Sequence, residues 1–217
     1  SQGNLGNGLT SNVYPVCSVK TEMQSRVKKI VFATEIGNIQ STIALLEDKS
    51  VWGTGRNLIG ELGRGNTTQV NTWTKITDGA DDIFNGSPAL FVVKGTVLYA
   101  CGANEMGSLG AGDTANKATL TQVKTSVDVK KIKSMRYYDG SNVTALTFLH
   151  SGNKVFGAGK NGDNQIIAAD TNNKSVFTEI TDNMGGSIVC SDGSDFAIGL
   201  FTNILLVPNG GNTDLWV

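Results

Sequence analysis

The sequence predicts an all-β protein, a β-propeller built from blades of about four strands. Three observations predict this fold: a motif that recurs along the chain, apolar segments too short and too β-branched for helices, and a repeat period of 47 to 57 residues. Roughly four repeats are visible, which form either a small closed ring or part of a larger one. We expect a single propeller domain over residues 1–217, in which the first and last elements complete one blade together.

The central repeat motif is a glycine-rich hexapeptide with an aliphatic residue in its middle. It reads GNLGNG at 3–8, GELGRG at 60–65, GSLGAG at 107–112 and, in a degenerate copy, NQIIAA at 164–169. A second aliphatic residue stands 14 positions after the central one in every copy: Val19 after Leu5, Ile76 after Leu62, Val123 after Leu109 and Ile180 after Ile166. Four equal spacings indicate a true internal repeat, which is typical of a propeller, a solenoid or an array.

A second shared element precedes the motif and ends in asparagine. It reads VWGTGRN at 51–57, LYACGAN at 98–104 and VFGAGKN at 155–161, with a weaker copy, VPNGGN, at 207–212. The elements of the repeat therefore lie near 1–19, 51–76, 98–123, 155–180 and 196–217.

Each repeat is expected to hold one hairpin and two further strands. Short apolar segments at 42–46, 89–93, 143–149 and 196–201 are each followed, after a few polar or glycine residues, by another short apolar segment. A third strand is expected at VKKI (27–30 and 129–132) and ADDI (80–83), and a fourth near the aliphatic residue that follows the motif. Four strands are the usual content of a propeller blade.

Six residues of the two best-preserved motifs are interpreted as structural. The glycines allow a positive φ or the close approach of another backbone, and the leucine anchors the turn in the core. These residues are Gly60, Leu62, Gly63, Gly107, Leu109 and Gly110.

The composition is neutral and rich in small polar residues, which excludes several classes of function. Gly (27), Asn (20), Thr (22) and Ser (16) dominate, whereas charged residues reach 17% and give a net charge of −1. Such a chain lacks the field that attracts nucleic acid or anionic lipid, and its apolar runs are too short to span a bilayer. The lysine pairs at 28–29 and 130–131 are interpreted as solvated strand-edge residues. We expect no nucleic-acid partner and no membrane insertion.

The sequence offers few groups for acid–base or nucleophilic catalysis. The one histidine, His150, stands beside SGNK and is interpreted as a turn residue. The GxGxxG at 157–162 is followed by DNQ and not by a helix, so its context excludes a dinucleotide site. We therefore expect a non-enzymatic protein without a cofactor.

Metal binding and disulfide bonding are also not indicated. The acidic residues at 78–82 and 192–195 lack the spacing of an EF-hand loop and are interpreted as solvated turn residues. The three cysteines, Cys17, Cys101 and Cys190, match no metal-ligand spacing and are interpreted as buried structural thiols. We expect no metal site.

The order of these elements resembles the repeat of the regulator of chromosome condensation family. The hairpin, then V-W-G-x-G-x-N, then G-x-L-G-x-G, is matched over essentially the whole chain and best in the units centred on Gly60 and Gly107. The resemblance implies a β-propeller, typically of about seven blades, and suggests nucleotide exchange on a small GTPase with chromatin binding. The family's Gly-x-x-His turn has no histidine in the corresponding stretches at 37–42, 85–89, 139–144 and 192–197.

A binding surface is expected where the repeats differ in length. Val19 to Asn57 and Val123 to Asn161 each span 38 residues, but Ile76 to Asn104 spans only 28, so the extra length is confined to one part of each repeat. The second long insertion holds three candidate loop residues for binding, of which the tyrosines could anchor an interface or stack on a sugar. They are Tyr137, Tyr138 and Asn142.

Three function hypotheses follow. The first is an adhesive, receptor-binding or structural module of a bacteriophage virion, of the tail-fibre or baseplate type, which the composition favours by analogy. Its partners would be a host-surface glycan or protein or other virion proteins, its location the virion surface or the extracellular space, and its state a homo-oligomer. The alternatives are a guanine-nucleotide exchange factor or another protein–protein interaction propeller, and a secreted enzyme-inhibitor propeller.

Overall fold

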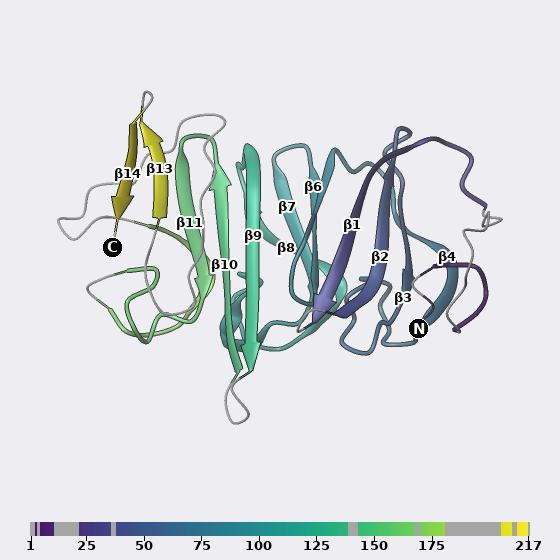
Figure 1. Ribbon diagram of the computed structural model, residues 1–217, viewed down its shortest axis with the longest axis horizontal. Coiled ribbons are helices and arrows are strands. Elements are labelled where there is room, and N and C mark those ends of the chain that lie inside the picture. The colour runs from purple at the N-terminus through teal and green to yellow at the C-terminus, as the bar shows by residue number, and fades with distance from the viewer. Residues whose placement is uncertain are drawn as a thin grey trace. The chain divides into compact units, whose positions relative to one another are not determined.

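The computed structural model describes residues 3, 5–10, 22–35, 38–138, 143–167, 170–180, 205–209 and 212–216. Over these residues the chain forms fourteen strands and one short 3-10 helix (Figure 1). The elements are β1 (Val27–Glu35), β2 (Asn38–Leu46), β3 (Val51–Gly55), β4 (Val70–Thr77), β5 (Asp82–Asn85), β6 (Ala89–Lys94), β7 (Val97–Gly102), η1 (Glu105–Gly107), β8 (Lys117–Thr125), β9 (Val129–Tyr138), β10 (Val143–Ser151), β11 (Lys154–Gly159), β12 (Lys174–Glu179), β13 (Leu205–Asn209) and β14 (Asn212–Trp216).

The first of two compact units comprises residues 1–103 and 115–125. It holds two four-stranded antiparallel sheets, in the orders β1-β2-β3-β4 and β5-β6-β7-β8. Neighbours in each sheet are also neighbours in the sequence, so each sheet is a simple meander, as in a propeller blade. We refer to these sheets as the first and second blades.

The second unit comprises residues 104–114 and 126–217. Its four-stranded antiparallel sheet has the order β9-β10-β11-β12, and we refer to it as the third blade. A two-stranded hairpin, β13-β14, lies nearer the C-terminus. The all-β fold with four-stranded antiparallel blades is the one that the sequence predicts.

The core of the first unit is formed where the central strands of its two blades bury apolar side chains. All of residues 89–93 in β6 are buried, and the cluster joins residues of both blades, such as Ile43, Leu45 and Leu62 from the first and Leu90 and Val92 from the second. By contrast β4, at the edge of its sheet, has only exposed and half-buried residues. In the second unit a smaller cluster is built around Phe148, Val155, Ile166 and Ile180.

Most strands lie where the sequence predicts them. The segments 42–46, 89–93 and 143–149 fall in β2, β6 and β10, and the two VKKI segments begin β1 and β9. The ADDI segment only overlaps its strand, because β5 begins at its third residue. The predicted strand at 196–201 lies outside the described residues.

The prediction for His150 is wrong in its local structure. His150 lies in β10, opposite Val155 and Lys131, and is only 1% exposed. The turn begins after Ser151, because the β10–β11 register continues to the Ser151–Lys154 pair. A polar side chain directly before a glycine-containing turn favours a turn assignment from sequence, but the sheet continues through it.

Within the described part of the chain, no helix is long and apolar enough to cross a membrane.

Candidate functional site

The candidate binding residues lie at the tip of the β9–β10 hairpin. β10 pairs with β11 only from Leu146 to Ser151, whereas its pairing with β9 continues to Val143 opposite Tyr138. Residues 136–138 and 143–145 therefore form a two-stranded ribbon that extends past the third strand of the blade (Figure 1). We call these six residues the ribbon extension.

Tyr137 and Tyr138 are strand residues and not loop residues, which corrects the sequence expectation. Tyr137 pairs with Thr144 and Tyr138 is the last residue of β9. Asn142 lies outside the described residues. The sequence expectation was wrong about the local structure because a turn signal, DGSN at 139–142, follows the tyrosines directly. Whether these residues bind a partner stays a prediction.

The length difference between repeats has a defined structural form. In the second blade the pairing of β5 with β6 ends at Asn85 opposite Leu90, and Ala89 still pairs with Gly102 of β7, so no ribbon extends past the third strand. In the first blade, by contrast, residues 38–39 of β2 pair with β1 beyond the last pair that β2 makes with β3. The extra residues of the long repeats thus lengthen the hairpin of the first two strands.

An ion pair fixes the ribbon extension to the rest of the second unit. Nη2 of Arg136 lies 3.0 Å from Oε1 of Glu105, the first residue of η1. The two side chains are only 13% and 28% exposed, so solvent screens this pair less than a surface pair. The other carboxylate oxygen of Glu105 is buried without a hydrogen-bond partner. Loss of Arg136 would therefore leave a largely buried charge uncompensated.

Two further hydrogen bonds hold the backbone of the β9–β10 hairpin. The backbone N–H of Lys160, which follows β11, donates to the carbonyl of Ala145 in the ribbon extension at 2.9 Å. Within the blade, the hydroxyl of Thr147 in β10 donates to that of Ser134 in β9 at 3.0 Å. Beyond them Tyr137 is 39% exposed. The ribbon extension therefore presents a large amphipathic ring from a held backbone, which is a suitable arrangement for contact with a partner.

A buried asparagine organises the loop that follows the third strand of each blade. Asn57, which is 0% exposed, accepts a hydrogen bond at Oδ1 from the backbone N–H of Leu62 at 2.9 Å. Its Nδ2 donates to the carbonyls of Asn66 at 2.9 Å and of Thr68 at 3.2 Å. One side chain thereby joins the middle of the glycine-rich motif to the residues that follow the motif. We call this arrangement the asparagine clamp.

Asn104 repeats the clamp in the next loop. Its Oδ1 accepts from the N–H of Leu109 at 2.8 Å, and its Nδ2 donates to the carbonyl of Asp113 at 2.9 Å. Asn104 is likewise 0% exposed. The asparagines that align in the sequence are therefore buried structural residues, and the spacing of their bonds is the same in both loops.

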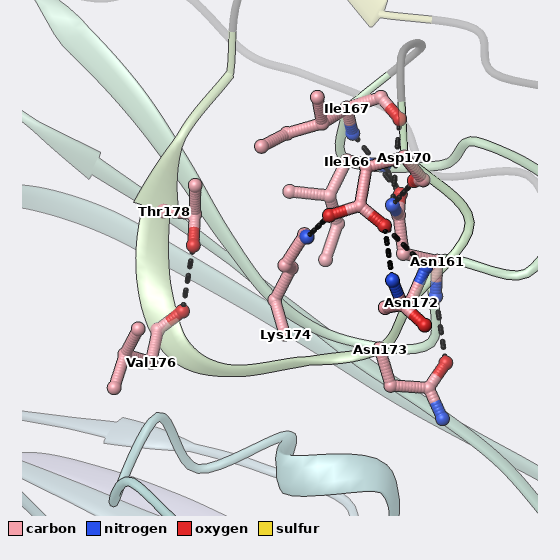
Figure 2. A network of polar contacts seen from close by, with 9 residues as sticks. All are labelled: Asn161, Ile166, Ile167, Asp170, Asn172, Asn173, Lys174, Val176 and Thr178. Carbon is pink, nitrogen blue, oxygen red and sulfur yellow. Dashed lines mark hydrogen bonds and ion pairs between the residues drawn. The ribbon is translucent and has the colours of Figure 1, made fainter.

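The third clamp is drawn in Figure 2. Oδ1 of Asn161 accepts from the N–H of Ile166 at 2.7 Å, and its Nδ2 donates to the carbonyl of Asp170. The carboxylate of Asp170 accepts from Lys174 and from the backbone N–H of Asn172. These hydrogen bonds, that from Lys174 first, hold the pKa of Asp170 below its ordinary value.

The sequence carries a signal for the clamp beyond the asparagine itself. The residue nine positions after the clamp asparagine is Asn or Asp in each case and is followed by Thr. The pairs are Asn66–Thr67, Asp113–Thr114 and Asp170–Thr171. In the first and third, the side-chain oxygen accepts from the N–H two residues later, which stabilises the turn that brings the carbonyl to the asparagine.

The motif residues interpreted as structural occupy tight positions. Gly60 has φ +85, and a Cβ there would overlap the backbone of Ala118 in β8. Gly63 has φ +63, and its Cβ would lie 2.8 Å from Sγ of Cys101. Leu62, between them, is 0% exposed. A Cβ at Gly107 would overlap the backbone of Ser175 in β12, and one at Gly110 would overlap the ring of Phe177 in the same strand. Leu109 is 1% exposed.

The cysteine and the acidic residues that the structure describes have structural roles. Cys101 is a buried free thiol whose pKa burial raises strongly, whereas Cys17 and Cys190 lie outside the described residues. Asp78, Asp81 and Asp82 form ion pairs with lysines. Among the described residues, no group of three or more His, Cys, Asp or Glu side chains could hold a metal ion.

Comparisons with known proteins find the chain's likeness in structure and not in sequence. No protein-family model and no curated protein matches it. Human WBSCR16 superimposes with a TM-score of 0.60 at 18% identity, over 82% of this chain and 45% of that protein. Prp20p from Saccharomyces cerevisiae, described with its binding properties to Gsp1p and histones, gives a TM-score of 0.51 at 16% identity, over 75% of this chain and 42% of that protein.

These likenesses define the class of fold. Both solved structures are propellers of the type found in the regulator of chromosome condensation, so the fold of this chain is of that type. The chain spans less than half the length of either protein.

Proposed function

We propose that the chain is a non-enzymatic propeller module that binds a protein partner, and that the ribbon extension forms part of the contact surface. The observation that carries the proposal is Tyr137, 39% exposed on a ribbon that the Arg136–Glu105 pair fixes in place. A rigid aromatic side chain on a held backbone loses little conformational entropy on binding, which is why tyrosine is frequent among the residues that dominate interface energy.

The fold supports a protein as the partner. Prp20p, which has a similar fold, is described with binding to Gsp1p and histones, both of them proteins. Exchange-factor activity on a small GTPase is a narrower form of the same proposal. Because the Gly-x-x-His turn of that family lacks its histidine here, we prefer general protein binding to exchange-factor activity.

The virion hypothesis is supported by composition alone. No compared structure supports a bacteriophage tail-fibre role or a host-surface or virion partner, and the same is true of the enzyme-inhibitor hypothesis. Because the structural likenesses favour an interaction propeller, we prefer protein binding to the adhesive hypothesis.

Binding measurements on the purified chain test the proposal. Immobilised Gsp1p and histones serve as protein probes, and a bacterial capsular polysaccharide serves as the non-protein probe. We expect saturable binding to at least one protein probe, roughly tenfold weaker or more in Tyr137→Ser. The matched control is Val176→Ser in β12, which also removes an exposed side chain of the second unit (53% exposed) and is expected to bind normally.

Two results would contradict the proposal. One is binding to the polysaccharide and to neither protein, which would favour the adhesive hypothesis. The other is protein binding that Tyr137→Ser and Val176→Ser weaken equally. A parallel assay of nucleotide release from a preloaded small GTPase separates exchange activity from binding alone.

A further inference from the structure

The leucine of the motif at 3–8 is exposed, although the repeat buries this position elsewhere. Leu5 is 44% exposed. The central residues of the other three motifs, Leu62, Leu109 and Ile166, are 0%, 1% and 2% exposed. Because equivalent positions of a repeat have equivalent surroundings, Leu5 requires a buried environment that the described residues do not supply.

The first strand of the first blade has the same property. VKKI of β1 aligns with ADDI at 80–83, so Ile30 corresponds to Ile83. Ile30 is 50% exposed, whereas Ile83 is 0% exposed. Val27 and Phe32, also in β1, are 46% and 43% exposed. A group of large apolar side chains exposed on one strand indicates an interaction surface.

The second blade shows what covers the equivalent strand. Ile83 lies in one apolar cluster with Ile43 of β2 and with Leu62, the motif leucine of the first blade. The preceding blade therefore encloses the first strand of the next blade, and its motif leucine is buried in the same cluster. By the repeat, Leu5 and Ile30 are the corresponding pair, and both are exposed.

The motif at 3–8 contacts the first blade as the next motif contacts the second blade. The backbone N–H of Gly8 donates to the carbonyl of Asn71 in β4 at 2.7 Å, and that of Gly65 donates to Ala118 of β8 at 2.7 Å. The β-bridges correspond in the same way: Asn7–Thr72 and Arg64–Thr119. The motif at 3–8 is thus placed on β4 as part of a blade that precedes the first one.

The origin of that blade follows from how a motif is joined to its strands. Each clamp asparagine stands two residues after the third strand of its blade and bonds the aliphatic residue five positions later, as Asn57 bonds Leu62. A motif is therefore continuous in sequence with its own blade. A second copy of the chain would bring a motif of its own, and the place for it on β4 is already occupied by residues 3–8.

We propose that the face of β1 bearing Ile30 and Phe32 is the docking face for a further repeat of the same chain, the repeat to which the motif at 3–8 belongs. Its first three strands pack on β1 as the first blade packs on the strand of Ile83, and they enclose Leu5. The docking face includes no residue of the ribbon extension, and the proposal does not depend on the proposed function.

Thiol labelling tests this docking face. Ile30→Cys is made in the 217-residue chain and in an extended chain, in which a copy of residues 25–59 replaces residues 1–2. The join places the copied asparagine five residues before Leu5 and supplies the apolar face that encloses Ile83 in the second blade. We expect iodoacetamide to label position 30 at least roughly tenfold more slowly in the extended chain, because labelling then requires local opening. Peptide mass spectrometry distinguishes this site from the native cysteines.

Three controls accompany the labelling. Leu58→Cys in the original loop, where Leu58 is 58% exposed, is expected to label equally fast in both chains. A copy that carries I43E is expected to give no protection, because the substitution places a charge on the covering face. A copy of residues 78–106 gives a second extended chain with the same spacing to Leu5, so the result does not depend on one copy alone.

Fast labelling of position 30 in both extended chains would overturn the proposal, as would equal protection by the I43E copy. Slow labelling in the 217-residue chain would also overturn it, because a segment within those residues or, if protection rises with concentration, a second copy would then cover β1. The reading frame ahead of Ser1 is an independent test: the repeat requires asparagine five residues before Leu5, and any other residue there would overturn the proposal.

Discussion

Substitution of Asn57 by alanine tests the asparagine clamp most directly. The side chain of Asn57 is 0% exposed and makes three backbone hydrogen bonds, one accepted from Leu62 and two donated to Asn66 and Thr68. Alanine preserves the backbone and removes all three. The partner groups differ in their access to water, because Leu62 is buried and Asn66 and Thr68 are exposed.

The magnitude follows from that difference. The N–H of Leu62 would lose its acceptor in a buried site, which costs about 1–3 kcal/mol. The two carbonyls can bind water instead, so each lost bond costs at most about 0.5–1 kcal/mol. We expect Asn57→Ala to lower the free energy of unfolding by about 2–5 kcal/mol, a large fraction of the stability of an ordinary domain.

Urea unfolding followed by circular dichroism measures this loss as a shift of the midpoint at unchanged slope. Leu58→Ala is the matched control: the neighbouring side chain is 58% exposed, and its removal is expected to change stability by no more than about 0.5 kcal/mol. A loss below about 1 kcal/mol for Asn57→Ala would refute the reasoning, because the N–H of Leu62 would then have found another partner.

Two further predictions concern the first unit. Gly63→Ala should lower the free energy of unfolding by about 2–4 kcal/mol, because it adds a Cβ 2.8 Å from Sγ of Cys101 at a φ of +63. The control Gly65→Ala, at φ +79 with no atom nearer than 3.8 Å, should cost only about 1–2 kcal/mol. Equal costs of the two variants in chemical denaturation would contradict the packing argument. The second prediction concerns pH: the hydrogen bond from Lys49 and that from the Gly95 N–H hold the pKa of Asp81 below its ordinary 3.8. Its stabilising effect is therefore complete above that value and is lost as pH falls through the lowered pKa, and Asp81→Asn should flatten the acid side of a plot of urea midpoint against pH. The effect should be small because both side chains are substantially exposed.

The repeat, the hairpins and the blade content could be predicted from the sequence because each rests on local information. Equal spacings and β-branched apolar runs predict where strands lie along the chain. The segments at 42–46, 89–93 and 143–149 are strands, as predicted. The role of the aligned asparagines could not be read in the same way. Their partners lie five to eleven residues away, and only the fold brings a carbonyl and an N–H to one amide.

The candidate site was predicted less well than the scaffold. The position of the extra length was evident from the spacing of 38 against 28 residues, but its form was not, since a ribbon and a loop have the same length in sequence. The Arg136–Glu105 pair joins residues 31 positions apart and had no local signal. A buried strand histidine, His150, was for the same reason indistinguishable from a turn residue.

The degenerate motif at 164–169 separates two structural requirements that glycine satisfies together in the other motifs: a positive φ and room for a neighbouring strand. The first position of the motif has positive φ in Gly60 and Gly107, and Asn164 keeps it at φ 59, because asparagine tolerates the left-handed region. The second demand is space: a Cβ at Gly107 would lie 2.5 Å from Cα of Ser175 in β12, and one at Gly60 would overlap Ala118. Asn164 carries a Cβ, so its loop keeps the turn and the clamp but cannot seat a strand as closely as the two glycine loops do. The residue at the first motif position therefore distinguishes two kinds of loop. Asparagine is compatible with a loop that only needs the turn, whereas glycine is needed where the loop also packs against a neighbouring strand.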